Sequence, residues 1–173
     1  MRPRTQHPSL LFVLIVAATL LTTLPASAQI GVSAAFTGAT VSHSGSSAGV
    51  YGPTVGVYAE SGKFLAFGGD LRGSFLNGNN RTLNSGGLGP RVALKLHPFP
   101  LQVYGEALVG FNSFRGPTTT SGSTHIDYQL LAGGDFTLLP RLDWRVFEYS
   151  YTGSSGSLSA DSFSTGLVLR LPF

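Results

Sequence analysis

Apolar residues recur at every second position over most of this chain, and this period constrains the fold more than any other feature. Side chains of a β-strand point alternately to opposite faces, whereas a helix repeats about every 3.6 residues. No stretch after residue 28 keeps the helical period, so the chain is expected to be all-β. The alternating runs cover residues 30–38, 50–60, 64–76, 86–97, 101–112, 126–137, 142–151 and 162–173.

The segments that join these eight runs are of two kinds. Short turns are expected at Glu60–Lys63, His97–Pro100 and Leu138–Arg141. Longer segments rich in Ser, Thr, Gly and Asn cover 39–49, 77–85, 113–125 and 152–161. Such polar segments could be disordered linkers. Their regular placement favours extracellular loops, because short turns at one end and long loops at the other are typical of an up-and-down outer-membrane barrel.

The polarity of the two strand faces separates a membrane barrel from a soluble one. In the last run Phe163, Leu167 and Leu169 share one face, while Ser164 and Arg170 lie on the other. A soluble barrel such as a lipocalin keeps its charges outside. Here one face of nearly every run is apolar and the other mixes charge with glycine, which indicates an apolar face toward lipid and a charged interior. Residues 163 and 173 would stand roughly 25 Å apart along the membrane normal, the height of an outer-membrane apolar band.

Residues 1–28 have the features of a signal peptide. Arg2 and Arg4 form a positive start, Leu10–Leu20 (LLFVLIVAATL) is apolar, and Ala26-Ser27-Ala28 forms a small-x-small site with cleavage expected before Gln29. The alternative is a transmembrane anchor, but a spanning helix needs about 20 apolar residues and this run is shorter. Residues 29–173 are then expected to be a single barrel domain.

Charge and cysteine content exclude several classes of protein. Without Arg2 and Arg4, nine of the eleven Lys and Arg residues remain against eight Asp and Glu, and no basic cluster suggests nucleic acid. The chain has no cysteine, which excludes a disulfide framework and a lipidated cysteine.

The interior of the expected barrel should be filled with ionisable side chains. Eight strands enclose a space just wide enough for side chains, and unpaired charges there would be costly. We therefore expect a packed network of salt bridges that plugs the lumen; a catalytic or ion-conducting cluster is the alternative. The inward ionisable residues are expected to be Asp70, Arg72, Arg91, Lys95, Glu106, Asp127, Asp135, Asp143, Arg145, Glu148 and Arg170.

Two segments resemble the OmpA-like outer-membrane barrels. Gly133-Gly134-Asp135-Phe136, a proline turn and Trp144–Tyr151 (WRVFEYSY) look like strands six and seven of that family. Phe173, preceded at alternate positions by Leu171, Leu169 and Leu167, resembles the strand that the outer-membrane barrel assembly machinery reads. The resemblance implies an eight-stranded antiparallel up-and-down barrel, Arg145 and Glu148 in the lumen, and insertion by that machinery.

The chain departs from the family pattern in two ways. The family usually places its Arg and Glu two residues apart, on one face of the strand. Here Arg145 and Glu148 are three apart, so both can point inward only if a β-bulge falls near Val146-Phe147. The chain is also expected to lack the peptidoglycan-binding domain of larger members, so a tethering role does not carry over.

Residues for other chemistry are sparse. His43, His97 and His125 have no zinc spacing, and neither a metal nor a cofactor is expected. Some eight-stranded outer-membrane barrels deacylate lipid A, but the adjacent His43 and Ser44 would point to opposite faces of a strand. The chain is thus expected to be a monomeric, non-enzymatic barrel that supports envelope integrity or surface interaction. Its expected partners are outer-membrane lipid or lipopolysaccharide and the assembly machinery; a narrow channel and a lipid A-modifying enzyme are the alternatives.

Overall fold

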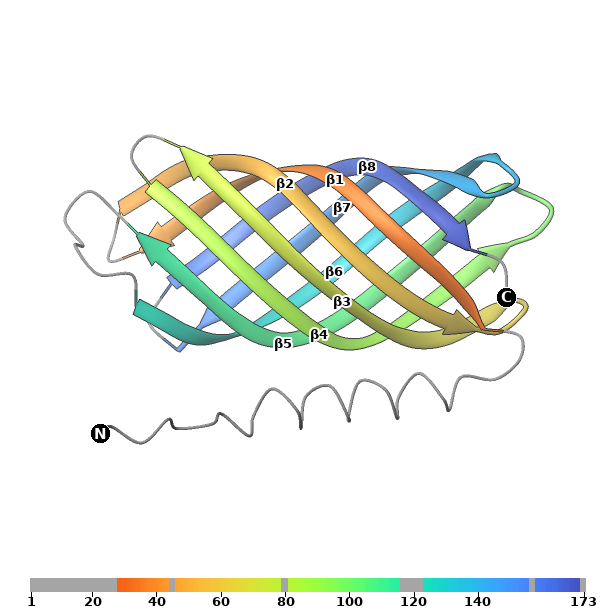
Figure 1. Cartoon of the computed structure of the whole chain (residues 1–173), viewed down its shortest axis with the longest axis horizontal. Coiled ribbons are helices and arrows are strands. Elements are labelled where there is room, and N and C mark those ends of the chain that lie inside the picture. Colours follow the sequence, from red (N-terminus) through yellow and green to blue (C-terminus); the bar gives the residue numbers. More distant parts are fainter. Residues whose placement is uncertain (1–27, 44–45, 79–80, 116–122, 156–157, 172–173) are drawn as a thin grey trace, which may run out of the picture.

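The computed structural model of the chain is a closed barrel of eight antiparallel strands (Figure 1). It describes residues 28–43, 46–78, 81–115, 123–155 and 158–171, so the expected signal peptide lies almost entirely outside the described residues. Each strand pairs with the next along the chain, and the last pairs with the first. The strands are β1 (Gln29–His43), β2 (Ser46–Ser61), β3 (Leu65–Gly78), β4 (Arg81–Leu96), β5 (Leu101–Arg115), β6 (Ser123–Leu139), β7 (Leu142–Ser154) and β8 (Leu158–Leu171).

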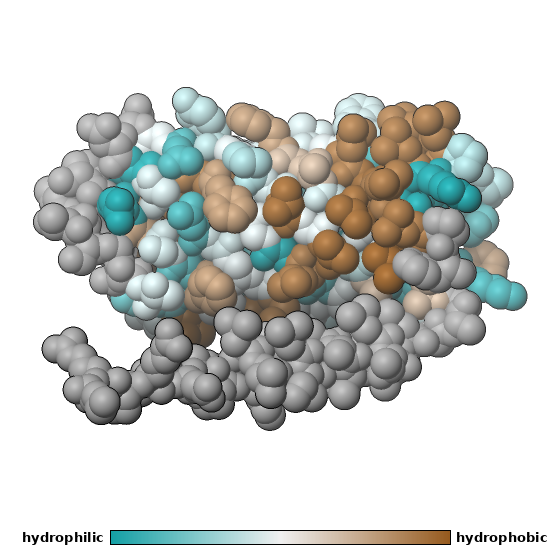
Figure 2. Space-filling view, viewed as in Figure 1, coloured by the Kyte–Doolittle hydropathy of each residue, from teal (hydrophilic) through white to brown (hydrophobic). Residues whose placement is uncertain are grey.

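The outer wall of the barrel is apolar, as the alternation predicts. On β8, Phe163, Leu167 and Leu169 are exposed, whereas Ser164 and Val168 are buried inside. Figure 2 shows hydrophobic side chains gathered toward the end of the barrel where β2 and β8 end, with mainly hydrophilic residues toward the other end. An apolar outer face around a charged interior is the polarity of a membrane barrel. Within the described residues, no helix is long and apolar enough to span a membrane.

The three short turns lie close to their predicted positions, at the end where β1 begins and β8 ends. The first shows why the chain can reverse here: Gly62 has a φ of +143°, and a Cβ added to it would lie 2.1 Å from the carbonyl oxygen of Leu65. Only glycine fits such a backbone without strain. At the opposite end the paired strands continue past the apolar wall as polar hairpins. Because outer-membrane barrels have short periplasmic turns and longer extracellular segments, the end with the three turns is the periplasmic one and the opposite end is the outer one.

The prediction of four long outer loops is largely wrong. β1 and β2 remain paired as far as His43 opposite Ser46, and β3 and β4 as far as Gly78 opposite Arg81. β7 and β8 likewise continue through most of 152–161, and even 113–125 is shortened to 116–122 between the ends of β5 and β6. These segments keep the period of two with their polarity reversed: apolar side chains face inward and polar ones outward. Their outward polarity was taken for loop character, but it reflects strands that continue beyond the apolar band.

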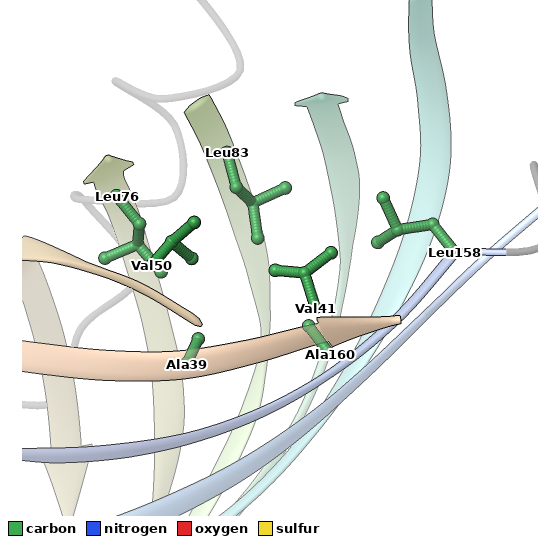
Figure 3. Packing of buried hydrophobic residues seen from close by; sticks show 7 residues of the cluster. All are labelled: Ala39, Val41, Val50, Leu76, Leu83, Leu158 and Ala160. Atoms are coloured by element: carbon green, nitrogen blue, oxygen red, sulfur yellow. The ribbon is translucent and has the colours of Figure 1, made fainter. Parts of the chain in front are cut away.

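The reversed polarity of the outer strand ends creates an apolar cluster inside the barrel, which we call the apolar cap. Seven buried side chains from β1, β2, β3, β4 and β8 meet there (Figure 3), and Phe114 of β5 packs against them half-buried. The cap fills the outer lumen with hydrocarbon on the side of β8 and β1–β4, whereas Asn112 of β5 and Asp127 of β6 are buried on the other side. The cap consists of Ala39, Val41, Val50, Leu76, Leu83, Leu158 and Ala160.

Candidate functional site

The β-bulge predicted from the spacing of Arg145 and Glu148 is present in β7. Opposite β8, Arg145 pairs with Gly166 and Glu148 pairs with Ser164, so two residues of β7 face the single residue between them. Those two residues, Val146 and Phe147, both point outward, with exposed fractions of 37% and 55%. Because the bulge adds one outward residue between Arg145 and Glu148, both charged side chains point into the lumen.

Glu148 joins three strands inside the barrel. Its carboxylate accepts hydrogen bonds from Arg72 Nη1 of β3 at 2.8 Å and from Arg145 Nη1 at 3.0 Å. The hydroxyl of Tyr104 on β5 donates a third at 2.7 Å. Charge-assisted hydrogen bonds of this kind are about twice as strong as neutral ones. Glu148 is only 2% exposed, so these three donors compensate for its removal from water.

Arg91 of β4 occupies the centre of the lumen. Its guanidinium lies between two aromatic rings, 4.1 Å from the centroid of Tyr58 and 3.8 Å from that of Tyr104. It donates to Glu60 at 3.1 Å and also to Glu106. A cation between two ring faces gains further electrostatic stabilisation when it is shielded from water, and Arg91 is 1% exposed.

The remaining pairs connect these two centres into one lumenal network. Glu106 bridges Arg72 and Arg91, while Arg145 pairs with Asp135 at 3.0 Å. Two pairs lie nearer the periplasmic rim, Lys95 with Glu60 at 3.2 Å and Arg170 with Asp143 at 2.7 Å. The structure therefore places all ten predicted network residues inside the barrel: Asp70, Arg72, Arg91, Lys95, Glu106, Asp135, Asp143, Arg145, Glu148 and Arg170.

Sequence reasoning missed Glu60 and misjudged Asp127. Glu60 was assigned to a turn, yet it is buried at the end of β2, where Arg91, Lys95 and Gln102 surround it. The signal was its phase, because it follows Tyr58 on the inward face. Asp127 is buried as expected, but it has no ion pair among the described residues. It accepts a long hydrogen bond, 3.4 Å, from Gln129 and lies beside the amide of Asn112.

Two inward glycines make room for the lumenal tyrosines. A Cβ on Gly31 would lie 2.2 Å from the ring of Tyr58, and one on Gly133 would lie 2.5 Å from the hydroxyl of Tyr104. Both rings therefore lie over bare backbone, in positions from which they can stack on Arg91. Any larger residue at either glycine would displace a ring from the network.

The fold has close counterparts among solved structures. No protein-family model and no curated protein matches the sequence. Neisserial surface protein A (NspA) has a TM-score of 0.62 at 18% identity over 82% of this chain and 97% of its own. Ail, the attachment invasion locus protein of Yersinia pestis, has a TM-score of 0.61 at 13% identity over 84% of this chain and 99% of its own. The chain therefore has the fold of the small eight-stranded outer-membrane β-barrels.

The similarity to these structures shows the fold alone. The outer membrane enzyme PagL also matches, with a TM-score of 0.52 at 16% identity over 81% of this chain and 99% of its own. The same outer-membrane barrel therefore carries proteins whose names describe surface attachment as well as an enzyme. Function has to be argued from the side chains of this barrel.

A belt of hydroxyl groups separates the lumenal network of this outer-membrane barrel from its apolar cap. Thr37 is hydrogen-bonded to Ser164 at 2.8 Å and to Thr54 at 2.7 Å, and Thr54 donates to Ser74 at 2.9 Å. Each of these residues is inward-facing, and Thr37 and Ser74 lie just two residues from cap positions on their own strands. On the side of β8 and β1–β3, the interior thus passes outward through three layers: charged, hydroxyl and apolar.

The histidines and the C-terminal residues considered in the sequence analysis do not belong to these layers. His97 lies at a periplasmic turn against Phe64, with 5.6 Å between ring centroids, and His125 lies near the outer end of β6. Among the described residues, no three His, Cys, Asp or Glu side chains group as a metal site. Of the predicted assembly signal, Leu167 and Leu169 face outward and Leu171 is half-buried, while Phe173 lies outside the described residues.

Proposed function

We propose that this protein is a non-enzymatic outer-membrane barrel with a closed lumen, which contributes to envelope integrity or to surface interaction through its outer end. The three-layered interior supports the proposal. Both Arg91 in the lumenal network and Val41 in the apolar cap are almost completely buried, one near the centre and the other toward the outer end of the same narrow space. A lumen filled in this way suits a rigid structural element better than a conduit.

The outer end of the barrel supports a role at the cell surface. The paired strands continue past the apolar band as hairpins. Backbone hydrogen bonds join the two strands of each hairpin, and the apolar cap packs against their inner face. Outward residues there, such as Thr40 and Asn77, are exposed. A partner would therefore meet a stiff polar rim, which loses little conformational entropy on binding.

Planar-bilayer recordings test the closed lumen. The purified barrel should give no stable, reproducible conductance, because charged, hydroxyl and apolar layers fill the cross-section in turn. A suitable positive control is an open porin reconstituted in the same bilayers, because its wide, water-filled lumen conducts ions. Stable unitary currents through the unaltered barrel would contradict the proposal and favour a narrow channel.

Fractionation of cells tests the export and localisation. The mature protein should begin at Gln29 and sediment with the outer membrane, because residues 1–28 have the n-region, apolar region and cleavage site of a signal peptide. N-terminal sequencing of the purified barrel is the direct measurement. Protein that keeps the Leu10–Leu20 segment and fractionates with the inner membrane would show that this segment is an anchor.

A further inference from the structure

One carboxylate of this barrel faces outward. The chain has eight Asp and Glu residues, and seven of them are buried in the lumen. The eighth, Asp161 of β8, is exposed on the outer wall, where the hydroxyl of Tyr149 donates to its Oδ1 at 2.5 Å. A carboxylate on the lipid side of a barrel is unfavourable unless it lies near the interface. Asp161 lies two residues beyond Phe163 in the polar outer part of β8, so it presents its carboxylate at the membrane interface.

A groove lies beside Asp161 on the outer wall. Gly38 and Gly49 face outward there, and a Cβ built on either would meet no atom within 4 Å. Gly38 is paired with Tyr51 on one side and with Phe163 on the other, so two aromatic residues flank a floor of bare backbone. The groove has a volume of about 510 Å³.

The groove is amphipathic along the barrel axis. Its periplasmic side is bounded by Tyr51 and Phe163, two exposed aromatic residues at the outer edge of the apolar band. Two residues further toward the outer end, Thr40 and Asp161 are paired across β1 and β8 and give the groove a polar wall. A molecule lying along β1 would place an apolar part toward the membrane core and a polar part toward the outside, which is the arrangement of a lipid in the outer leaflet.

The polar wall specifies the chemistry of the headgroup. An ionised carboxylate only accepts hydrogen bonds, and it has about four lone-pair sites, of which Tyr149 uses one. The part of the headgroup that meets Asp161 must therefore supply donors, because a phosphate at that point would be repelled. Sugar hydroxyls supply such donors, and the C–H face of a sugar ring can pack on an aromatic side chain such as Tyr51 or Phe163. We propose that this groove binds one glycolipid of the outer leaflet, with an acyl chain over Gly38 and a sugar hydroxyl donating to Asp161.

Lipid retention by the full barrel in detergent micelles tests the proposal, with native mass spectrometry as the readout and purified lipid A as the probe. The unaltered barrel should retain one lipid A. Gly38→Leu fills the floor of the groove at a position where a Cβ meets no atom within 4 Å, and it should lower retention by roughly tenfold or more. Asp161→Asn keeps the shape and removes the charge, and it should lower retention on the order of tenfold, the value of one hydrogen bond to a charged group.

The matched control is Gly105→Leu, which adds the same side chain to an outward glycine of β5 that lies outside the groove. It should retain lipid A as the unaltered barrel does. Equal retention by Gly38→Leu and Gly105→Leu would overturn the site. Phosphatidylethanolamine bound as tightly as lipid A, with the same sensitivity to Asp161→Asn, would overturn the glycolipid as occupant. The lipid site requires only that the barrel lies in the outer membrane, and it does not require a closed lumen. The lipid-retention result is therefore independent of the conductance measurements.

Discussion

Replacing Arg91 by methionine should lower the free energy of unfolding by about 5 kcal/mol, the upper end of the range for breaking a buried ion pair. Methionine keeps much of the hydrocarbon volume but none of the charge. Glu60 and Glu106 would each lose a donor, and the stacked contacts with Tyr58 and Tyr104 would lose their cation. The lumen would then hold seven acids against four bases, with little water to screen them.

Equilibrium unfolding in guanidinium, with the barrel in detergent or lipid vesicles, measures this loss through the fluorescence of Trp144, the one tryptophan of the chain. Arg141→Met is the matched control. Its side chain is exposed at a periplasmic turn, so its loss should cost about 1 kcal/mol or less. Adding Glu60→Gln and Glu106→Gln to Arg91→Met should recover part of the stability, because it removes the stranded charges. Equal losses for the two arginine variants would contradict a central role for Arg91.

The membrane-spanning part of the fold and most of the network could be predicted because they depend on the phase of alternation. A charged side chain in a membrane-spanning strand is stable only when it points into the lumen. Each Asp, Glu or Arg in such a strand therefore identifies the inward face. At Arg145 and Glu148 two such residues disagreed in phase, and the bulge at Val146-Phe147 was the one solution that put both inside. Conflict between charge and phase was therefore as informative as agreement.

The outer strand ends could not be predicted because the polarity of the two strand faces reverses outside the membrane: apolar side chains point inward and polar ones outward. Residues 39–43 alternate as the spanning strands do, but with Ala39 and Val41 inside and Thr40 outside. In such short segments rich in Ser and Gly, the alternation of apolar and polar residues is weak evidence for a strand. Outward polar residues then look like a loop, because an apolar outward face is the expected mark of a strand. The apolar cap remained hidden for the same reason. The groove at Gly38 could not be inferred at all, because it depends on the register of three strands.

Glu148→Ala should lower the free energy of unfolding by about 3–5 kcal/mol. The substitution leaves the guanidinium groups of Arg72 and Arg145 with one acceptor fewer each, and it strands the hydroxyl of Tyr104 in the lumen. Glu148→Gln keeps the shape and part of the hydrogen bonding, so it should cost less than alanine. The same guanidinium titration followed through Trp144 provides the measurement. A loss for Glu148→Ala as small as that for the exposed Asp161→Ala would show that the ion pairs around Glu148 contribute little.

Deleting Val146 separates the need for Glu148 inside from the need for the bulge itself. In the ladder with β6, Phe147 pairs with Gly134 and Arg145 with Asp135, so Val146 is the residue without a partner. Its removal leaves one outward residue between Arg145 and Glu148, which both stay inside, and should cost roughly 1 kcal/mol, the typical cost of a single change. Deleting Val146 and Phe147 together makes the two charged residues adjacent and therefore sends one of them into lipid. That variant should fail to form the heat-resistant barrel band on electrophoresis, whereas the single deletion should keep it. If both deletions fold equally well, the inward direction of Glu148 is not what the bulge secures.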